Sequence, residues 1–370
     1  MKKKTIFAVS LLIIITAFFY ACKVNYTTRG FIGSLENKLE GKTLNSKFDV
    51  KIKSGNLCTN YDINTVINDI DKLGLNTLNV PVVINISSVT ASDMSIDNYS
   101  KNQAATLIKR LKGKGINIIL EPYPWIENGS KAETEWSPEK VDHFFVNWKT
   151  KVLKPLIDDI AVPYHVDALD IGTSFTKMES EEDSFCDMAD FVRKYYKGLV
   201  TYRTSWWITT NWNEPSTKEI QDNLQKKYEK KLNNRLFSKL DFISIASYFE
   251  LTDNDTNTAD NLASAMECSQ RYNRKQNIKQ EIKNFYTKWN KPIFFGELGF
   301  PPADKASIEP WSPYRSNKAN GLEQANCFQA YKTVFENEPW NLGFSIFAIG
   351  NTNEDNHYYT SDASIEVIRG

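Results

Sequence analysis

The sequence predicts a single (β/α)8 barrel. Segments typical of strands alternate with segments typical of helices from about residue 48 to residue 349. No two of the predicted strands are joined by a connection short enough for a hairpin. An open, doubly wound sheet would normally carry a Gly-rich phosphate-binding turn after an early strand, and the sequence has no such turn. These three observations favour a closed ring of parallel strands.

The eight predicted strands are short apolar or β-branched runs. They are residues 48–54, 75–83, 116–125, 166–173, 199–207, 241–248, 293–297 and 342–349.

The predicted helices lie between these strands and carry recognisable start and stop signals. Gly74 and Gly115 end the first two, and Ser137-Pro-Glu begins the third. The heavily charged segment 217–240 is typical of a helix with a solvated face. The helices are expected at 61–73, 98–114, 137–160, 182–197, 217–240, 261–289 (with a break near Asn277) and 321–335.

Composition excludes some classes of partner. The 370 residues include 45 basic and 45 acidic side chains, so the formal net charge is zero, and no Lys/Arg-rich stripe is present. Both observations argue against nucleic-acid binding. The aromatic content of 13%, with nine Trp, is typical of proteins that bind flat ligands such as sugars, although core packing also uses such residues. We expect a monomer.

The N-terminus has the pattern of an export signal. Three lysines at 2–4 precede an apolar run, 5–21, which is short for a membrane span. The run ends in Phe-Tyr-Ala-Cys22, which resembles the lipobox of bacterial lipoproteins. We therefore predict a signal peptide at 1–21, a tether at 22–29 and the barrel at 30–370. Cys22 would carry the lipid, and the protein would be anchored outside the cytoplasmic membrane. The alternative is an uncleaved short anchor.

The remaining cysteines do not indicate a metal site. Cys58, Cys186, Cys268 and Cys327 form no Cys-x-x-Cys pair, and the three histidines show no ligand spacing with them. We expect no metal and no organic cofactor.

Residues at the carboxyl ends of the strands are the candidate site, because these ends share one rim of a barrel. The set is rich in aromatic, Asn and acidic side chains and poor in His and Lys. This composition favours a neutral polyhydroxylated ligand and argues against phosphate chemistry. The strand-end candidates are Asn79, Pro81, Glu121, Tyr123, Trp125, Thr173, Ser174, Trp206, Trp207, Ser247, Tyr248, Glu297 and 347–351, and the loops add Trp136, 212–214 and 309–311.

Glu297 is the central candidate. It follows the apolar run Ile293-Phe-Phe-Gly296 and precedes a Gly-Phe-Pro-Pro turn at 299–302. An acid placed against a Phe-rich strand end is costly unless it is used. Retaining glycoside hydrolysis needs two carboxyl groups ~5–5.5 Å apart, and Glu297 fits the nucleophile. The alternative is a solvated or ion-paired structural residue.

The Phe-Gly-Glu-Leu-Gly-Phe motif resembles the strand-seven end of clan A glycoside hydrolases, and the chain is similar to glycoside hydrolase family 113, the endo-β-mannanase-like enzymes. The resemblance implies a (β/α)8 fold, an oligo- or polysaccharide substrate and Glu297 as nucleophile. Ligand-binding candidates at the rim are Glu121, Tyr123, Trp125, Ser174, Trp206, Tyr248 and Trp311. The resembling segments are 133–136, 170–173, 199–202, 245–249, 291–300, 308–311 and 324–340.

One departure from the family concerns the acid/base residue. The family has Gly-Thr-Glu at the end of strand four, and this chain has Gly-Thr-Ser174. A serine cannot protonate a leaving group as a carboxylic acid does. Glu179, in the same loop, is the provisional replacement, and its rivals are Glu121 and Glu214.

Other departures change the expected substrate. Glu121 and Tyr123 stand where the family has Lys and His, and Ala246 stands where it has Asp. We therefore predict a retaining glycosidase for a β-linked cell-envelope or environmental polysaccharide, without assigning mannan. The alternatives are an inactive carbohydrate-binding lipoprotein and a surface scaffold or adhesin.

Overall fold

A computed structural model describes residue 48 and residues 50–210, 218–351 and 356–370. The predicted signal peptide and tether, with Cys22, lie outside the described residues, as does Glu214. In the described part of the chain, no helix combines the length and the apolar character needed to cross a bilayer.

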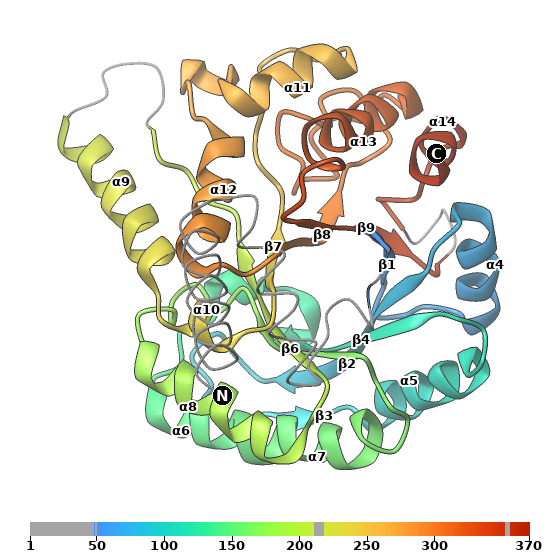
Figure 1. Ribbon diagram of the computed structural model, residues 1–370, viewed down its shortest axis with the longest axis vertical. Coiled ribbons are helices and arrows are strands. Elements are labelled where there is room, and N and C mark those ends of the chain that lie inside the picture. The colour runs from blue at the N-terminus through green and yellow to red at the C-terminus, as the bar shows by residue number, and fades with distance from the viewer. Residues whose placement is uncertain (1–47, 49, 211–217, 352–355) are drawn as a thin grey trace, which may run out of the picture. The chain divides into compact units, whose positions relative to one another are not determined.

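Residues 51–370 form a closed barrel of eight parallel strands, which confirms the predicted fold. The first strand pairs with both the second and the last, and this double pairing closes the ring. Helices surround the strands (Figure 1). The barrel strands are β1 (Ile52–Leu57), β2 (Thr77–Ile86), β4 (Asn117–Ile126), β5 (Ala168–Thr173), β6 (Leu199–Ser205), β7 (Ile243–Ala246), β8 (Ile293–Gly299) and β9 (Asn341–Ile349).

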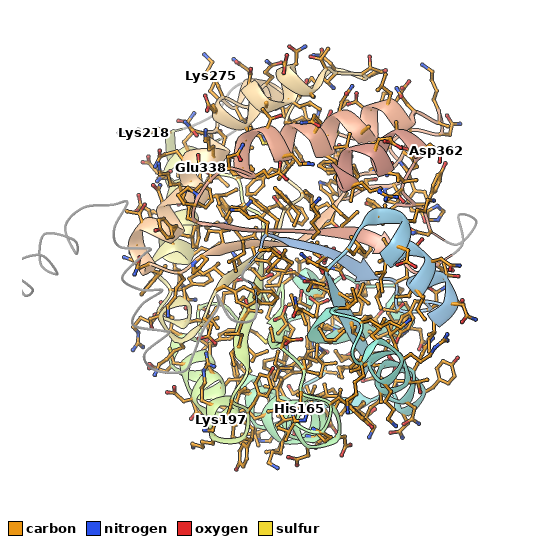
Figure 2. The ribbon with its side chains drawn as sticks, turned by 45° about the vertical axis from the view of Figure 1, so that its right-hand side comes forward. His165, Lys197, Lys218, Lys275, Glu338 and Asp362 are labelled. Atoms are coloured by element: carbon orange, nitrogen blue, oxygen red, sulfur yellow. The ribbon has the colours of Figure 1, made fainter. Side chains whose placement is uncertain are left out.

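The helices follow the predicted pattern, with the helix after each strand packed outside the ring. Side chains occupy the space between strands and helices, and labelled polar residues such as Lys197 and Asp362 lie at the periphery (Figure 2). The helices are α4 (Ile63–Leu73), α5 (Asn98–Leu111), α6 (Val141–Asn147), α7 (Lys154–Leu156), α8 (Glu182–Tyr195), α9 (Lys218–Asn233), α10 (Leu236–Lys239), α11 (Ala259–Glu267), α12 (Ile278–Trp289), α13 (Gly321–Phe335) and α14 (Asp362–Arg369).

Local signals explain several helix ends. Gly74 ends α4 in the left-handed conformation, with φ of 66°, and its N–H donates to the Ile70 carbonyl. The predicted break near Asn277 is confirmed, because the Asn277 side chain caps the start of α12 by accepting from the Gln280 N–H at 2.9 Å.

The first strand and a strand that was not predicted show where the sequence pattern is least informative. The first strand covers 52–57 rather than 48–54, because Gly55 and Asn56, which look like turn residues in sequence, belong to the ladder. A Cβ on Gly55 would lie 2.1 Å from the Ile349 side chain, so a larger residue there would force that side chain to move. The two-residue strand β3 (Ser95–Ile96) pairs antiparallel with β2 and is too short to leave a sequence pattern.

Two tryptophans that were candidates for the rim belong to the core instead. Trp136 is fully buried, packs against Phe144 at 4.9 Å between ring centroids, and donates its indole N–H to the Ala91 carbonyl at 2.9 Å. Trp207 is also buried and packs 5.0 Å from Phe285 of α12. Their hydrophobic area contributes to stability and is not available to a ligand.

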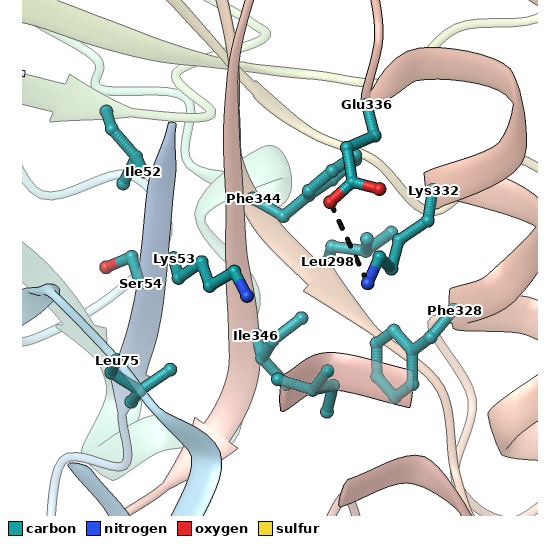
Figure 3. A pocket seen from close by; sticks show the side chains of 11 residues that line it. Ile52, Lys53, Ser54, Leu75, Leu298, Phe328, Lys332, Glu336, Phe344 and Ile346 are labelled. Carbon is teal, nitrogen blue, oxygen red and sulfur yellow. Dashed lines mark ion pairs between the residues drawn. The ribbon is translucent and has the colours of Figure 1, made fainter. Parts of the chain in front are cut away.

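A small apolar cavity lies on the outer side of the barrel, between the strands β1 and β9 and the helices α13 and α14 (Figure 3). Its volume of about 40 Å³ is far below the ~300–1,000 Å³ of a typical ligand pocket. Leu298 of β8 lines it. Because neighbouring residues of a strand point to opposite faces, Glu297 faces the inside of the ring.

Candidate functional site

An irregular stretch of β8 presents Glu297 at the rim. The pairing register of β8 shifts between Phe295 and Leu298 on the β9 side, and that of β7 shifts between Ser244 and Ala246 on the other side. Such bulges bend a strand and re-aim a side chain. Gly296, which precedes the acid, packs closely on Ser244, because a Cβ added there would lie 1.9 Å from the serine hydroxyl oxygen. The Glu297 side chain is 14% exposed.

Two side chains, one on β6 and one just after β7, orient the Glu297 carboxylate. The Tyr248 hydroxyl, after β7, donates to Oε1 at 2.6 Å. Nη2 of Arg203, on β6, lies 3.0 Å from Oε2. With both oxygens engaged by donors on separate strands, the carboxylate is held in one orientation, as a preorganised catalytic group should be.

Arg203 is the centre of a buried charge network inside the barrel. It is 1% exposed, pairs with Glu121 of β4 at 2.5 Å, and donates from Nε to the Thr173 hydroxyl at 2.8 Å. Burial on its own lowers the pKa of Arg203, but the Glu121 and Glu297 carboxylates raise it above its usual value. The guanidinium is therefore a permanent positive charge beside Glu297.

Glu121, one of the rival acids, is committed to this network. It is 2% exposed and also accepts from the Asn79 amide at 3.1 Å. Burial raises the pKa of Glu121, although Arg203 acts in the opposite direction. Asp170 of β5, which the sequence did not single out, lies in the same interior, and burial together with Glu121 raises its pKa well above the usual range.

The provisional acid/base, Glu179, lies on the other side of β6. Its carboxylate accepts from Thr204 at 2.9 Å and from Tyr202 at 3.1 Å and pairs with Lys231 of α9 at 2.6 Å. Tyr202 and Thr204 flank Arg203 in the strand, so their side chains point away from the barrel interior. The structure thus does not bring Glu179 together with Glu297, and the Lys231 contact is that of a structural ion pair.

A different acid, Glu133, belongs to the interior cluster. It begins the short 3-10 turn Glu133–Glu135 after β4 and is half-buried. Burial raises the pKa of Glu133 to about 7, and the negative charge of Glu297 contributes in the same direction. Glu133 in turn is the main cause of a strongly raised pKa at Tyr123, followed by burial and Glu297. The charge of Glu297 thus contributes to the raised pKa of both Glu133 and Tyr123.

The sequence identified Glu133 only as part of a segment resembling the family. The available signal for Glu133 was its position three residues before Trp136. The buried Trp136 ring fixes the turn Glu133–Glu135. No periodicity in the sequence connects a carboxylate in this loop with Glu297 on β8.

The predicted ligand-binding residues occupy several parts of the rim. The half-buried rings of Tyr123 and Trp125 lie 6.5 Å apart, and Trp206 packs edge-on against Tyr248 at 5.5 Å. Trp311 is 46% exposed and donates its indole N–H to Glu250 at 3.3 Å.

Ser174 is buried directly after β5, where its N–H donates to the Arg203 carbonyl at 2.7 Å. Among the described residues, no group of three or more His, Cys, Asp or Glu side chains is arranged to hold a metal ion.

Comparisons with known proteins agree with this architecture. The model of Glycoside Hydrolase Family 113 matches residues 90–365. A β-mannanase of that family from Alicyclobacillus acidocaldarius superposes with a TM-score of 0.67 at 17% identity, covering 87% of this chain and 98% of the other. A β-1,4-mannanase of family 113 gives 0.63 at 18% identity, covering 86% and 97%. A family 5 mannosidase from Rhizomucor miehei gives 0.54 at 12% identity, covering 86% and 91%. No curated protein of similar sequence was found.

Proposed function

Since the chain belongs to glycoside hydrolase family 113, we propose that it is a retaining glycosidase that cleaves a β-linked polysaccharide of the cell envelope or the environment. The observation that carries this proposal is the placement of Glu297, which is oriented by Tyr248 and Arg203 at the rim of the barrel. A carboxylate held in this way is equipped to act as a nucleophile.

The reaction would proceed in two steps. A Glu297 oxygen attacks the anomeric carbon while the glycosidic bond breaks, and the departing oxygen takes a proton from a carboxylic acid. Water then attacks the same carbon and releases Glu297, so the configuration of the sugar is retained. Arg203 keeps a positive charge beside the carboxylate that is released.

The substrate class is supported by the solved structures and by the residues at the rim. The structural neighbours named β-1,4-mannanase and β-mannanase make β-linked glycans the first class to test. The exposed face of Trp311 and the half-buried ring of Trp206 provide apolar surfaces on which sugar rings stack. Glu121 stands where the family has Lys, and it is paired with Arg203. Sugars other than mannose should therefore be tested together with mannose.

A second candidate function is carbohydrate binding without turnover. The specific observation in its favour is Ser174, which stands where the family resemblance implies the acid/base carboxyl. In this case Glu297 would bind a sugar hydroxyl.

The proposed cellular location follows from the N-terminal sequence. We propose export and lipidation at Cys22, which would hold the barrel at the outer side of the cytoplasmic membrane. A polysaccharide substrate would be accessible there.

The test of the proposed function is covalent trapping of the sugar on Glu297. A panel of activated fluoro-β-glycosides that includes manno, gluco and galacto configurations is incubated with the protein, and intact mass is measured before peptide mapping. We expect one glycosyl adduct per chain, located on Glu297. A chain that binds glycans in titration calorimetry but forms no adduct with any reagent and releases no sugar would establish the second candidate.

Replacement of Tyr248 by Phe tests the orientation of the nucleophile. The substitution removes the 2.6 Å hydrogen bond to Glu297, and a hydrogen bond to a charged group is worth ~1.5–3 kcal/mol. We expect kcat/KM to fall ~10–100-fold, since 1.4 kcal/mol corresponds to a factor of ten. Steady-state kinetics on the best substrate would measure this loss. Tyr358→Phe is the matched control, because the Tyr358 hydroxyl donates to the Pro310 carbonyl. Equal losses in the two variants would contradict the assignment.

A further inference from the structure

The glycosidase mechanism needs a proton donor, and Ser174 cannot serve as one. Three carboxyl groups of the described barrel interior interact with the nucleophile or with its arginine: Glu121, Asp170 and Glu133. Glu121 is 2% exposed and Asp170 is 1% exposed, so both lie too deep to reach a sugar oxygen at the rim. Glu133 is half-buried and follows β4 on its carboxyl side, where the substrate would lie.

The turn that carries Glu133 is fixed by its surroundings. The Trp136 N–H donates to the Glu133 carbonyl at 3.1 Å, and the Trp136 ring is buried in an aromatic cluster that includes Phe175 at 5.4 Å. The Glu135 carboxylate accepts from the Ala132 N–H at 3.1 Å, which closes the turn on itself. A loop anchored in this way can hold a catalytic group in place, as a strand end does.

We infer that Glu133 is the general acid/base of this barrel and supplies, from the loop after β4, the carboxyl group that Ser174 lacks after β5. The inference rests on the proposed glycosidase function. It identifies the second catalytic carboxyl group beside Glu297. It also explains how this chain could cleave glycosides although Ser174 replaces the usual acid/base residue.

The proton balance is complete without any further reactant. Protonated Glu133 gives its proton to the glycosidic oxygen as the bond to the anomeric carbon breaks and Glu297 becomes esterified. The resulting Glu133 carboxylate then takes a proton from the attacking water. Hydrolysis of the ester frees Glu297, and Glu133 is protonated again.

The electrostatics of the cluster suit both halves of this cycle. Burial and the negative charge of Glu297 raise the pKa of Glu133 to about 7, and Glu121 adds to the effect while Arg203 opposes it. Glu133 is therefore mainly protonated in the resting site below about pH 7. Esterification removes the charge of Glu297, which lowers the pKa of Glu133 at the moment when it must act as a base. The other charged groups nearby, Glu135 and Lys131, pair with each other at 3.7 Å.

The experiment compares Glu133→Gln and Glu133→Ala with Glu179→Gln, the matched control on the outer face of β6. The substrates are aryl β-glycosides of a sugar that the native protein cleaves, with either a 2,4-dinitrophenyl or a 4-methoxyphenyl leaving group. The first leaves without a proton and the second requires one. For both Glu133 variants we expect kcat/KM to fall ~10²–10⁴-fold on the methoxyphenyl substrate and to stay near the native value on the dinitrophenyl substrate.

Two further readouts separate an acid/base from a residue that only supports the fold. In Glu133→Ala, azide is expected to restore turnover of the dinitrophenyl substrate and to give a glycosyl azide of retained configuration. The native kcat/KM on the methoxyphenyl substrate is expected to decline as pH rises through about 7, and this decline is expected to disappear in Glu133→Gln. Circular dichroism melting curves of all variants show whether they are folded.

Each result decides the inference. Native-like cleavage of the methoxyphenyl substrate by both Glu133 variants would overturn it while leaving the glycosidase function intact. The leaving-group and azide signatures in Glu179→Gln would overturn it in favour of the sequence-based assignment. A native protein that cleaves no glycoside would remove the proposed function, and the inference with it.

Discussion

Replacing Glu297 by Ala is expected to abolish glycoside hydrolysis. Removal of the nucleophile from a covalent mechanism costs up to ~10⁶-fold in kcat, and we expect a loss of at least ~10⁴-fold on the best substrate. Glu297→Gln, which keeps the shape of the side chain, should be equally inactive because an amide cannot form the ester intermediate. Steady-state hydrolysis of the glycan panel measures the effect.

The folded state should tolerate this change. Arg203 keeps its ion pair with Glu121 after Glu297 is removed, so no buried cation is left without a partner. We therefore expect a melting curve close to that of the native protein. Azide added to Glu297→Ala should yield a glycosyl azide of inverted configuration, the opposite of the product expected from the Glu133 variant. Turnover of Glu297→Ala at the native rate would exclude the proposed mechanism.

Replacing Arg203 by Met is expected to destabilise the barrel by ~3–5 kcal/mol, the usual cost of removing one partner from a buried ion pair. The substitution leaves the carboxyl groups of Glu121 and Glu297 inside the ring without the cation that pairs with both. Urea unfolding at pH 8 measures the loss.

The pH dependence of this loss has a definite sign. Without Arg203, the folded-state pKa of Glu121, which burial already raises, should rise further above its value in the unfolded chain. A carboxyl group with a raised pKa favours the folded state at low pH and opposes it as pH increases. Arg203→Met should therefore lose less stability at pH 5 than at pH 8. The double variant Arg203→Met/Glu121→Gln, which removes one of the two charges, should recover part of the loss. Native stability of Arg203→Met at pH 8 would contradict the role assigned to the network.

The sequence was sufficient for the barrel and for the position of Glu297 at the end of its strand, because both depend on local patterns. Apolar runs and glycine caps identify strands and helix ends, and the position of a residue along its strand identifies the rim. The two core tryptophans show where this reasoning fails. Trp136 and Trp207 follow strands in the chain, but their side chains pack behind the strands, and only three-dimensional packing determines that direction.

The surroundings of Glu179 could not be predicted from sequence distance. Glu179 lies five residues after Ser174, yet it binds Tyr202 and Thr204 on the outer face of β6. Side chains alternate between the two faces of a strand, so Tyr202 and Thr204 would have placed Glu179 outside the barrel if they had been known to bind it. Glu133 is 41 residues before Ser174 in the chain, and its loop shares a rim with the end of β8 only because β4 and β8 belong to the same closed ring.

The tight contact between Gly296 and Ser244 limits how this site can be redesigned. Even one methyl group at residue 296 would lie 1.9 Å from the Ser244 hydroxyl oxygen, so that hydroxyl would have to move. The Asn56 side chain, on β1, also donates to the Gly296 carbonyl at 2.9 Å. Libraries intended to change sugar preference should therefore leave this glycine constant and diversify the aromatic loops, where new side chains meet solvent and not backbone.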